Sequence, residues 1–196
     1  RTCWVFMNLV KDIEPYRYEY YGQKDDAIEL TQVFGKFEDI SHEAFFTMKS
    51  NDGFIKNEAM NLVSQRYYIK IKGKDAPMNI SPHIKLGMNV QEMAWFSTNA
   101  DAAIFPKQMA ELLGEGQIDG AKGILLSEIL EEVGVKDIED KCFEILSVDG
   151  QTVKASGMDL YEGLLTISER DNYGVRWSER LELEPIENLL CVKVVE

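Results

Sequence analysis

Five side chains in the sequence carry a thiol or an imidazole, the groups that often act as nucleophiles, general bases and soft-metal ligands. They are Cys3, Cys142, Cys191, His42 and His83. No two cysteines have a C-x-x-C spacing, so the sequence predicts neither a zinc site nor a disulfide framework. G-x-S-x-G, H-E-x-x-H and P-loop motifs are absent as well. The common signatures of hydrolases, metalloproteases and nucleotide-binding proteins therefore do not apply.

The least ordinary stretch is YRYEYYG, residues 16–22, which places four tyrosines within seven residues. A tyrosine combines a flat apolar ring with a polar tip, so this run is suited to line a ligand groove. A half-exposed strand would have the same pattern, and both interpretations stay open. Asp25, Asp26, Asp119 and the Asp-Gly pairs at 52–53 and 149–150 could suggest calcium binding, but the spacing of an EF-hand loop is missing, and Asp-Gly is the expected sequence of a turn.

The elements that must position these residues are short. Alternating apolar and polar residues predict strands at 2–8, 44–49, 68–72, 93–98, 142–147, 176–184 and 189–195. Two short helices are expected, one at 106–114 that starts at a proline, and one capped by Ser127 that ends at Gly134. We therefore expect an α+β fold of mixed short-strand sheets with a few short helices. Cys142 and Cys191 fall in predicted strands and are expected in the core.

Composition excludes several classes of protein. Hydrophobic residues make up 45% of the 196 residues, enough for a folded core. The chain has 34 acidic and 21 basic residues, a net charge of −13 that repels nucleic acids. No apolar run approaches the roughly 18 residues of a membrane span. The compartment stays open, export and the cell surface included, because a signal peptide would lie upstream of Arg1.

Residues 22–62 and 116–160 share a series of landmarks in the same order, with only short gaps between them. The matches are Gly22-Gln23 with Gly116-Gln117, Ile28 with Ile124, Leu30 with Leu126, Phe45 with Phe143, Asp52-Gly53 with Asp149-Gly150, and Met60 with Met158. Upstream, Trp4 and Asn8 align with Trp95 and Asn99. We interpret this as a tandem repeat. The first, N-terminally truncated unit is 1–66, and the second, more complete unit is 67–196.

Three segments, YYIKIKGKDAPMNIS (67–81), GAKGILLSEILEEVGVKD (120–137) and FEILSVDGQTVKASGMDL (143–160), resemble the molybdopterin-binding oxidoreductase domain of the sulfite oxidase family. Residues 123–135 take the place of that family's G-V-P-L-x-x-L-L-x-x-x-G-V helix. Residues 143–150 take the place of its strand and Asp-Gly turn. The likeness covers roughly residues 67–160, and residues 3–62 form a second, weaker copy.

The resemblance implies a pterin pocket and a cysteine thiolate that binds molybdenum. By the repeat alignment, Cys3, just before Trp4, is the candidate metal ligand, while the second copy has Ala94 before Trp95. Trp95, Ser97 and Asn99 are expected, with Cys3, to line the cofactor pocket. The family's basic substrate and phosphate residues have no clear match.

The sequence thus predicts a degenerate molybdopterin-oxidoreductase-like protein that binds a small molecule or a protein partner and does not perform full oxo-transfer. No catalytic residue is assigned, and the cofactor is left unknown, with molybdopterin implied only by the resemblance. One alternative is a non-catalytic interaction module on the same scaffold. A second is an intact molybdopterin-dependent oxidoreductase with Cys3 as its metal ligand.

Overall fold

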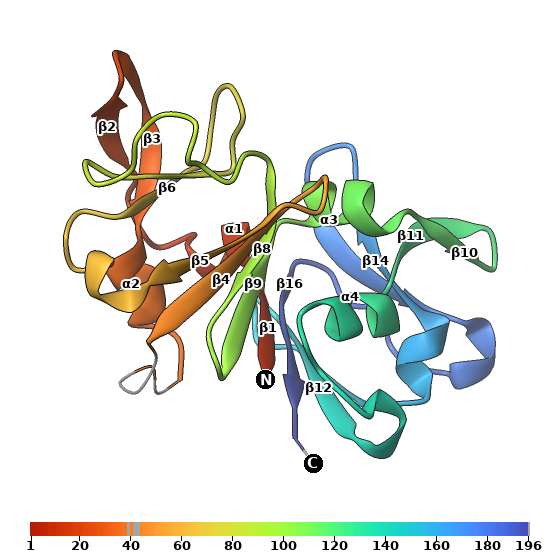
Figure 1. Cartoon of the computed structure of the whole chain (residues 1–196). Helices are drawn as coiled ribbons and strands as arrows, with labels where there is room; N and C mark the ends of the chain where they lie inside the picture. The colour runs from red at the N-terminus through yellow and green to blue at the C-terminus, as the bar shows by residue number, and fades with distance from the viewer. Residues whose placement is uncertain (39, 41–43, 196) are drawn as a thin grey trace.

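The computed structural model describes residues 1–38, 40 and 44–195, and Figure 1 shows their arrangement. Strands account for 41% of the residues and helices for 19%, so the predicted α+β class of sheets with few short helices is confirmed. Among the described residues, no helix is both long and apolar enough to cross a membrane.

The strands and α-helices follow the same order in the two halves of the chain. The first half contains β1 (Thr2–Val5), α1 (Phe6–Leu9), β2 (Tyr16–Tyr20), β3 (Gln23–Glu29), α2 (Leu30–Phe34), β4 (Phe45–Ser50), β5 (Ile55–Ala59), β6 (Tyr68–Lys70), β7 (Met78–Ile80) and β8 (Met93–Ser97). The second half contains β9 (Asp101–Ile104), α3 (Pro106–Leu113), β10 (Gly116–Ile118), β11 (Ala121–Leu125), α4 (Leu126–Glu132), β12 (Cys142–Ser147), β13 (Thr152–Ser156), β14 (Gly163–Ile167), β15 (Tyr173–Trp177) and β16 (Leu189–Val194). Short 3-10 turns lie at Met60–Leu62, Ile138–Asp140, Asp159–Glu162 and Glu179–Leu181.

One eight-stranded sheet joins the two halves, in the order β13-β12-β16-β1-β9-β8-β4-β5. At its centre β1 and β9 run parallel. On either side β16 pairs with β1 and β8 pairs with β9, both antiparallel. The last strand of each half therefore pairs with the first strand of the other half. Each half adds a hairpin outside this centre and a separate four-stranded sheet, β2-β3-β6-β7 or β10-β11-β14-β15.

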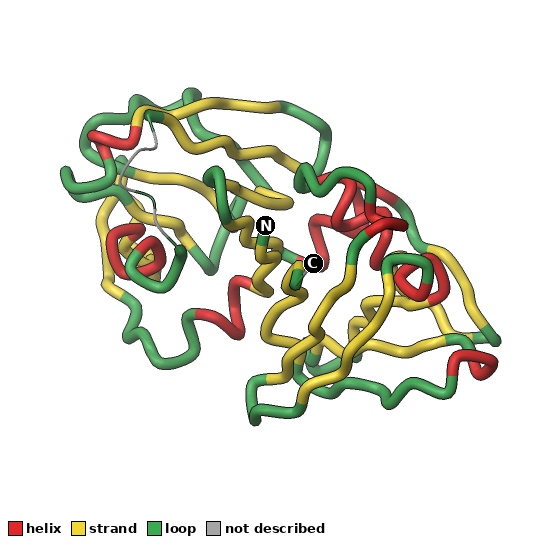
Figure 2. The backbone as a smooth tube through the Cα atoms, turned by 90° about the horizontal axis from the view of Figure 1, so that it is seen from below, coloured by secondary structure: helices red, strands yellow, loops and turns green. Residues whose placement is uncertain are grey.

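The central strands contribute side chains to two hydrophobic cores, one on each face of the large sheet. Cys3 and Val5 of β1 belong to the core of the second half, whereas Phe6, which follows, belongs to the core of the first half. On β9, Ile104 and Ala103 divide between the cores in the same way, because successive strand residues point to opposite faces. Figure 2 shows the result as two lobes on either side of the strands near the two termini.

Several predicted elements differ from those observed. The helix α3 begins at Pro106 and ends before Gly114, as predicted. Ser127, however, does not cap α4: β11 runs directly into the helix, which leaves Ser127 buried in its first turn. The predicted strand 2–8 ends at Val5, where α1 begins. The predicted strand 176–184 is wrong beyond Trp177, because the chain turns there into the 3-10 segment 179–181.

A close backbone contact within the second half provides a test of the fold. A Cβ atom added at Gly157 would lie 1.6 Å from the carbonyl oxygen of Ile138. We expect Gly157→Ala to lower the free energy of unfolding by about 1–3 kcal/mol or more, because backbone must move to admit the methyl group. Urea denaturation followed by circular dichroism measures this.

The matched control is Gly116→Ala, where the nearest atom to the added Cβ is a Leu125 side-chain carbon at 3.7 Å. This variant should stay within about 0.5 kcal/mol of the original chain. Equal stability of the two variants would contradict the described packing of residue 157 against the Ile138 turn.

Candidate ligand site

The outer face of the four-stranded sheet β2-β3-β6-β7 collects the tyrosines of the 16–22 run. Strand β2 pairs with β3 so that Tyr18 lies opposite Asp25. Strand β3 pairs with β6 so that Ala27 lies opposite Lys70. Paired residues point to the same face, and side chains alternate along each strand. The opposite face sends Ile28 into the core of the first half, so the tyrosine face is the outer one.

The tyrosine rings on this face stack on one another. Tyr18 stacks on Tyr68 with ring centroids 4.6 Å apart, and Tyr16 stacks on Tyr68 from 5.8 Å. Tyr20 stacks on Tyr18 at 6.5 Å and meets Tyr21 edge-on at 4.7 Å. The run forms a half-exposed strand, β2, and it also lines a hollow, so the two interpretations of the sequence do not exclude each other.

The hollow is a groove of about 270 Å³ on the outer face, hereafter the tyrosine groove. Its lining residues are Tyr18, Tyr20, Tyr21, Gln23, Asp25, Lys70, Lys74, Asp75, Met78, Ile80, Leu86 and Gln91. They come from β2, β3, β6, β7 and the loops that follow β6 and β7. Residues 50 positions and more apart in the sequence thus share one surface.

An ion pair lies within this lining. Lys70 Nζ lies 3.1 Å from Asp25 Oδ2 and donates a hydrogen bond of 2.7 Å to the carbonyl oxygen of Lys74. The Lys70 side chain is only 4% exposed, against 25% for Asp25. A lysine so deeply buried needs a charged partner, because taking an isolated ammonium out of water costs much free energy. Asp25 fulfils that requirement.

The loop that borders the groove, residues 81–92, is held by hydrogen bonds to Tyr20 of β2 and Asn79 of β7. The Tyr20 hydroxyl donates to the carbonyl oxygen of Ile84 at 2.7 Å and accepts from the Asn89 amide at 3.2 Å. Asn89 also donates to the carbonyl oxygen of Asn79 at 2.7 Å. The Val90 backbone N–H donates to Asn79 Oδ1 at 2.6 Å. One groove tyrosine therefore fastens the loop directly.

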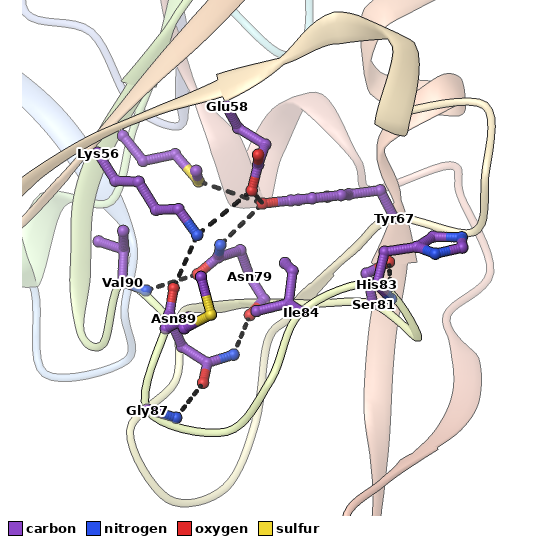
Figure 3. A network of polar contacts seen from close by, with 12 residues as sticks. Lys56, Glu58, Tyr67, Asn79, Ser81, His83, Ile84, Gly87, Asn89 and Val90 are labelled. Atoms are coloured by element: carbon purple, nitrogen blue, oxygen red, sulfur yellow. Dashed lines mark hydrogen bonds and ion pairs between the residues drawn. The ribbon is translucent and has the colours of Figure 1, made fainter.

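The same network continues inward (Figure 3). The Asn79 amide donates to the Tyr67 hydroxyl at 2.8 Å, and that hydroxyl donates to Glu58 of β5 at 3.2 Å. Burial raises the pKa of Tyr67 far above its usual range, so its hydroxyl remains a donor at every ordinary pH. Lys56 lies 3.3 Å from Glu58 and donates to the carbonyl oxygen of Met88 at 2.9 Å. The loop is thus tied to the edge of the eight-stranded sheet.

The residues predicted for a cofactor pocket lie elsewhere. Cys3 of β1 is paired with Ala102 of β9, which is paired with Ser97 of β8, and Trp95 stands two residues before Ser97. These three predicted residues share the face of the large sheet that α3 and α4 cover. Asn99 lies in the exposed turn between β8 and β9. The structure therefore brings Cys3, Trp95 and Ser97 onto one face of the large sheet, but α3 and α4 pack against that face.

The environment of Cys3 does not fit a molybdenum ligand. Its side chain is buried in the core of the second half, and burial, with the nearby Cys191, raises the pKa of the thiol to about 12. A metal ligand must be a thiolate, which this apolar surrounding disfavours. The Trp95 indole donates to Glu132 at 3.2 Å and is 7% exposed, as a core residue would be.

Among the described residues, the remaining thiols and the imidazole of His83 have ordinary surroundings. Cys191 is buried, as predicted. The prediction for Cys142 is wrong: it is exposed, because Phe143 occupies the inward position of β12. His83 is exposed, and its imidazole points away from the network around Asn79 (Figure 3). His42 lies outside the described residues.

Sequence reasoning missed Lys70 as a site residue and considered Asp25 only as a calcium ligand. The alternation at 68–72 placed Lys70 on a solvent face, where most lysines lie. The turn expected at residues 73–77 brings the carbonyl oxygen of Lys74 to Lys70, and this contact has no local signal in the sequence. The tyrosine run was the signal that did point to this surface.

Comparisons with known proteins give no relative from which a function could be carried over. No family model, no curated protein and no solved structure matches the chain. The function is therefore inferred from the residues of the site.

The burial of the thiols predicts their reactivity. At pH 8 the native chain should react with Ellman's reagent at one cysteine, Cys142, whereas Cys3 and Cys191 should react only after denaturation. A pKa near 12 instead of 9 lowers the thiolate fraction of Cys3 about a thousandfold at that pH. Cys142→Ser should abolish the fast reaction. Rapid labelling of Cys3 in the native chain would contradict its burial and reopen the metal-ligand interpretation.

The network predicts that Asn79 is a stability determinant of the groove. Asn79→Ala leaves the Val90 N–H without its acceptor and removes the hydrogen bond that the Tyr67 hydroxyl accepts, and we expect a loss of about 2–4 kcal/mol in unfolding free energy. The control Asn57→Ala removes an exposed hydrogen bond with Thr47 and should change stability by less than about 0.5 kcal/mol. Urea titration monitored by tryptophan fluorescence compares them. Equal losses would show that the Asn79 network is not formed.

Proposed function

We propose that this chain is a non-catalytic binding protein whose ligand occupies the tyrosine groove. The observation that carries the proposal is the groove itself, a concave surface with aromatic and aliphatic walls and a buried ion pair, Lys70–Asp25, in its lining. Small-molecule sites are typically concave and largely apolar, with a few fixed polar groups. The hydrogen-bond network around Asn79 favours this assignment because it holds the groove in one shape without a ligand.

The same residues favour binding over catalysis. Asp25 and Lys70, both in the lining of the groove, form an ion pair with each other, and in the described part of the chain no hydrogen bond joins either of them to a hydroxyl or a thiol. A general base must be free to take a proton from a reacting group. The buried thiol of Cys3 argues in the same direction, because it is poorly suited to anchor an oxo-transfer metal.

The scaffold, on this proposal, consists of two tandem units that resemble the sulfite oxidase molybdopterin-binding domain and have diverged. The recurring order of elements and the symmetrical order of the large sheet support duplication. We propose a boundary between the units at residues 98–100, further along the chain than residue 66, because β6 pairs with β3 and β8 pairs with β4. Trp4, on the first strand of its half, then no longer corresponds to Trp95, on the last strand.

The corresponding face of the second half lacks the features of the groove. Strand β11 pairs Leu125 with Leu164 as β3 pairs Glu29 with Tyr68, so Leu164 and Thr166 stand where Tyr68 and Lys70 do. A bridge between Val175 and Ile186 brings an extra segment against β15. This asymmetry supports a single binding site per chain, in the first half.

A fragment screen by two-dimensional ¹H–¹⁵N NMR tests the proposal. Fragments of mixed charge should shift the amide signals of Tyr18, Asp25 and Met78, and Gln23→Trp should weaken their binding at least about tenfold by filling the groove. The matched control is Gln117→Trp on the exposed hairpin of the second half, which should leave binding unchanged.

Two results would overturn the proposal. In the first, no fragment shifts the groove signals of the unmodified chain, or Gln23→Trp leaves every shift intact. In the second, elemental analysis of the full-length protein from a cofactor-competent host gives stoichiometric molybdenum or tungsten that Cys3→Ser removes. The second result would favour the oxidoreductase alternative.

A further inference from the structure

We infer that the tyrosine groove takes a neutral, polyhydroxylated ligand, a sugar of one or two rings. The inference builds on the proposed function and adds the chemical class of the ligand. It follows from the charge balance, the hydrogen-bonding groups and the orientation of the rings in the groove.

The charges of the lining cancel. Asp25 neutralises Lys70 across 3.1 Å, and the two other charged side chains of the lining, Lys74 and Asp75, are neighbours of opposite sign. An anion would face two carboxylates and a net charge of −13 on the whole chain. A cation would face two ammonium groups. A ligand without net charge meets neither penalty.

The polar groups suit hydroxyls, which both donate and accept hydrogen bonds. Within the described part of the chain, Lys70 has two hydrogen-bond or ion-pair partners for its three N–H donors. The ring of Tyr18 contacts other rings, but its hydroxyl has no hydrogen bond within the described part of the chain. Burial raises the pKa of Tyr18, so the hydroxyl remains protonated. Gln23 and Gln91 add an amide donor and acceptor each. Ring hydroxyls can satisfy such a mixed set from several directions.

The rings of the groove are not arranged as a cage for an organic cation. A cation–π site needs several open ring faces, but the Tyr18 ring stacks on that of Tyr68 with centroids 4.6 Å apart, so one of its faces is covered. Tyr21 meets Tyr20 edge-on and stays 61% exposed. The exposed ring of Tyr21 and the side chain of Leu86, which is 64% exposed, both line the groove and offer apolar surface. Such a surface fits the C–H face of a sugar ring, while the hydroxyls face the polar groups.

The size of the groove limits the ligand. About 270 Å³ lies just below the range of roughly 300–1,000 Å³ of pockets that enclose drug-sized molecules. An oligosaccharide would extend beyond the lining, so one or two rings are expected to make the contacts.

Saturation-transfer NMR and calorimetry with three kinds of probe test the inference. The neutral probes are methyl α-glucopyranoside, N-acetylglucosamine and maltose, the cationic probe is choline, and the anionic probe is acetate. At least one sugar should bind, and Tyr18→Phe should weaken it roughly fivefold to tenfold by removing one hydroxyl. Tyr16→Phe is the matched control, because Tyr16 lies on the same strand outside the groove. It should leave the affinity unchanged.

The outcomes separate the inference from the proposed function. Binding of choline or acetate, lost in Gln23→Trp, with no sugar bound, would overturn the sugar assignment and retain a binding groove. Sugar binding that Tyr18→Phe and Gln23→Trp leave intact would place the sugar elsewhere and overturn the inference. If no probe binds and the fragment screen also leaves the groove signals unshifted, both the inference and the proposed function are wrong.

Discussion

The parallel pair β1–β9 is the constraint on which the rest of the structure depends. Each residue of these strands enters one of two cores, because the pair is covered on both faces. A slip of one residue would exchange the two sets of side chains between cores of different shape, so the register is strongly specified. Asp101 helps to fix it: it is fully buried and accepts hydrogen bonds of 2.8 Å from the Trp4 indole and from the Glu38 backbone.

The tyrosine groove is held in place through its contacts with the core around β1 and β9. The inner face of the β2-β3-β6-β7 sheet contributes Ile28 and Ile69 to the core of the first half, so the sheet cannot shift without disturbing that core. The same inner face is also connected, through Tyr67 and Asn79, to Glu58 on the edge hairpin of the large sheet. The groove therefore has its shape before a ligand arrives, which lowers the entropic cost of binding.

Local patterns in the sequence predicted the elements that have local causes. The helix α3 follows from Pro106 and Gly114, and β12 follows from the alternation that begins before Phe143. The partners of these elements have no local cause. Nothing near β8 indicates that it pairs with β4 and ends the first half, and an alternating pattern does not tell which face a loop will cover. For the same reason the tyrosines were recognised as a possible groove while Lys70 was not.

Lys70 is the clearest conflict between local preference and final position. A lysine on the outer face of a sheet ordinarily extends its ammonium into water, yet this side chain is 4% exposed and held between Asp25 and the carbonyl oxygen of Lys74. A well-packed apolar residue at such a position is often as stable as a buried ion pair or more so, which makes the pair weak evidence for a role in stability. Departures from local preference concentrate at functional sites. The second half has the uncharged Thr166 at the corresponding place, so the shared arrangement of strands does not require a buried charge there. The role of Lys70 is therefore better explained by the groove that this residue lines than by the fold that the two halves share.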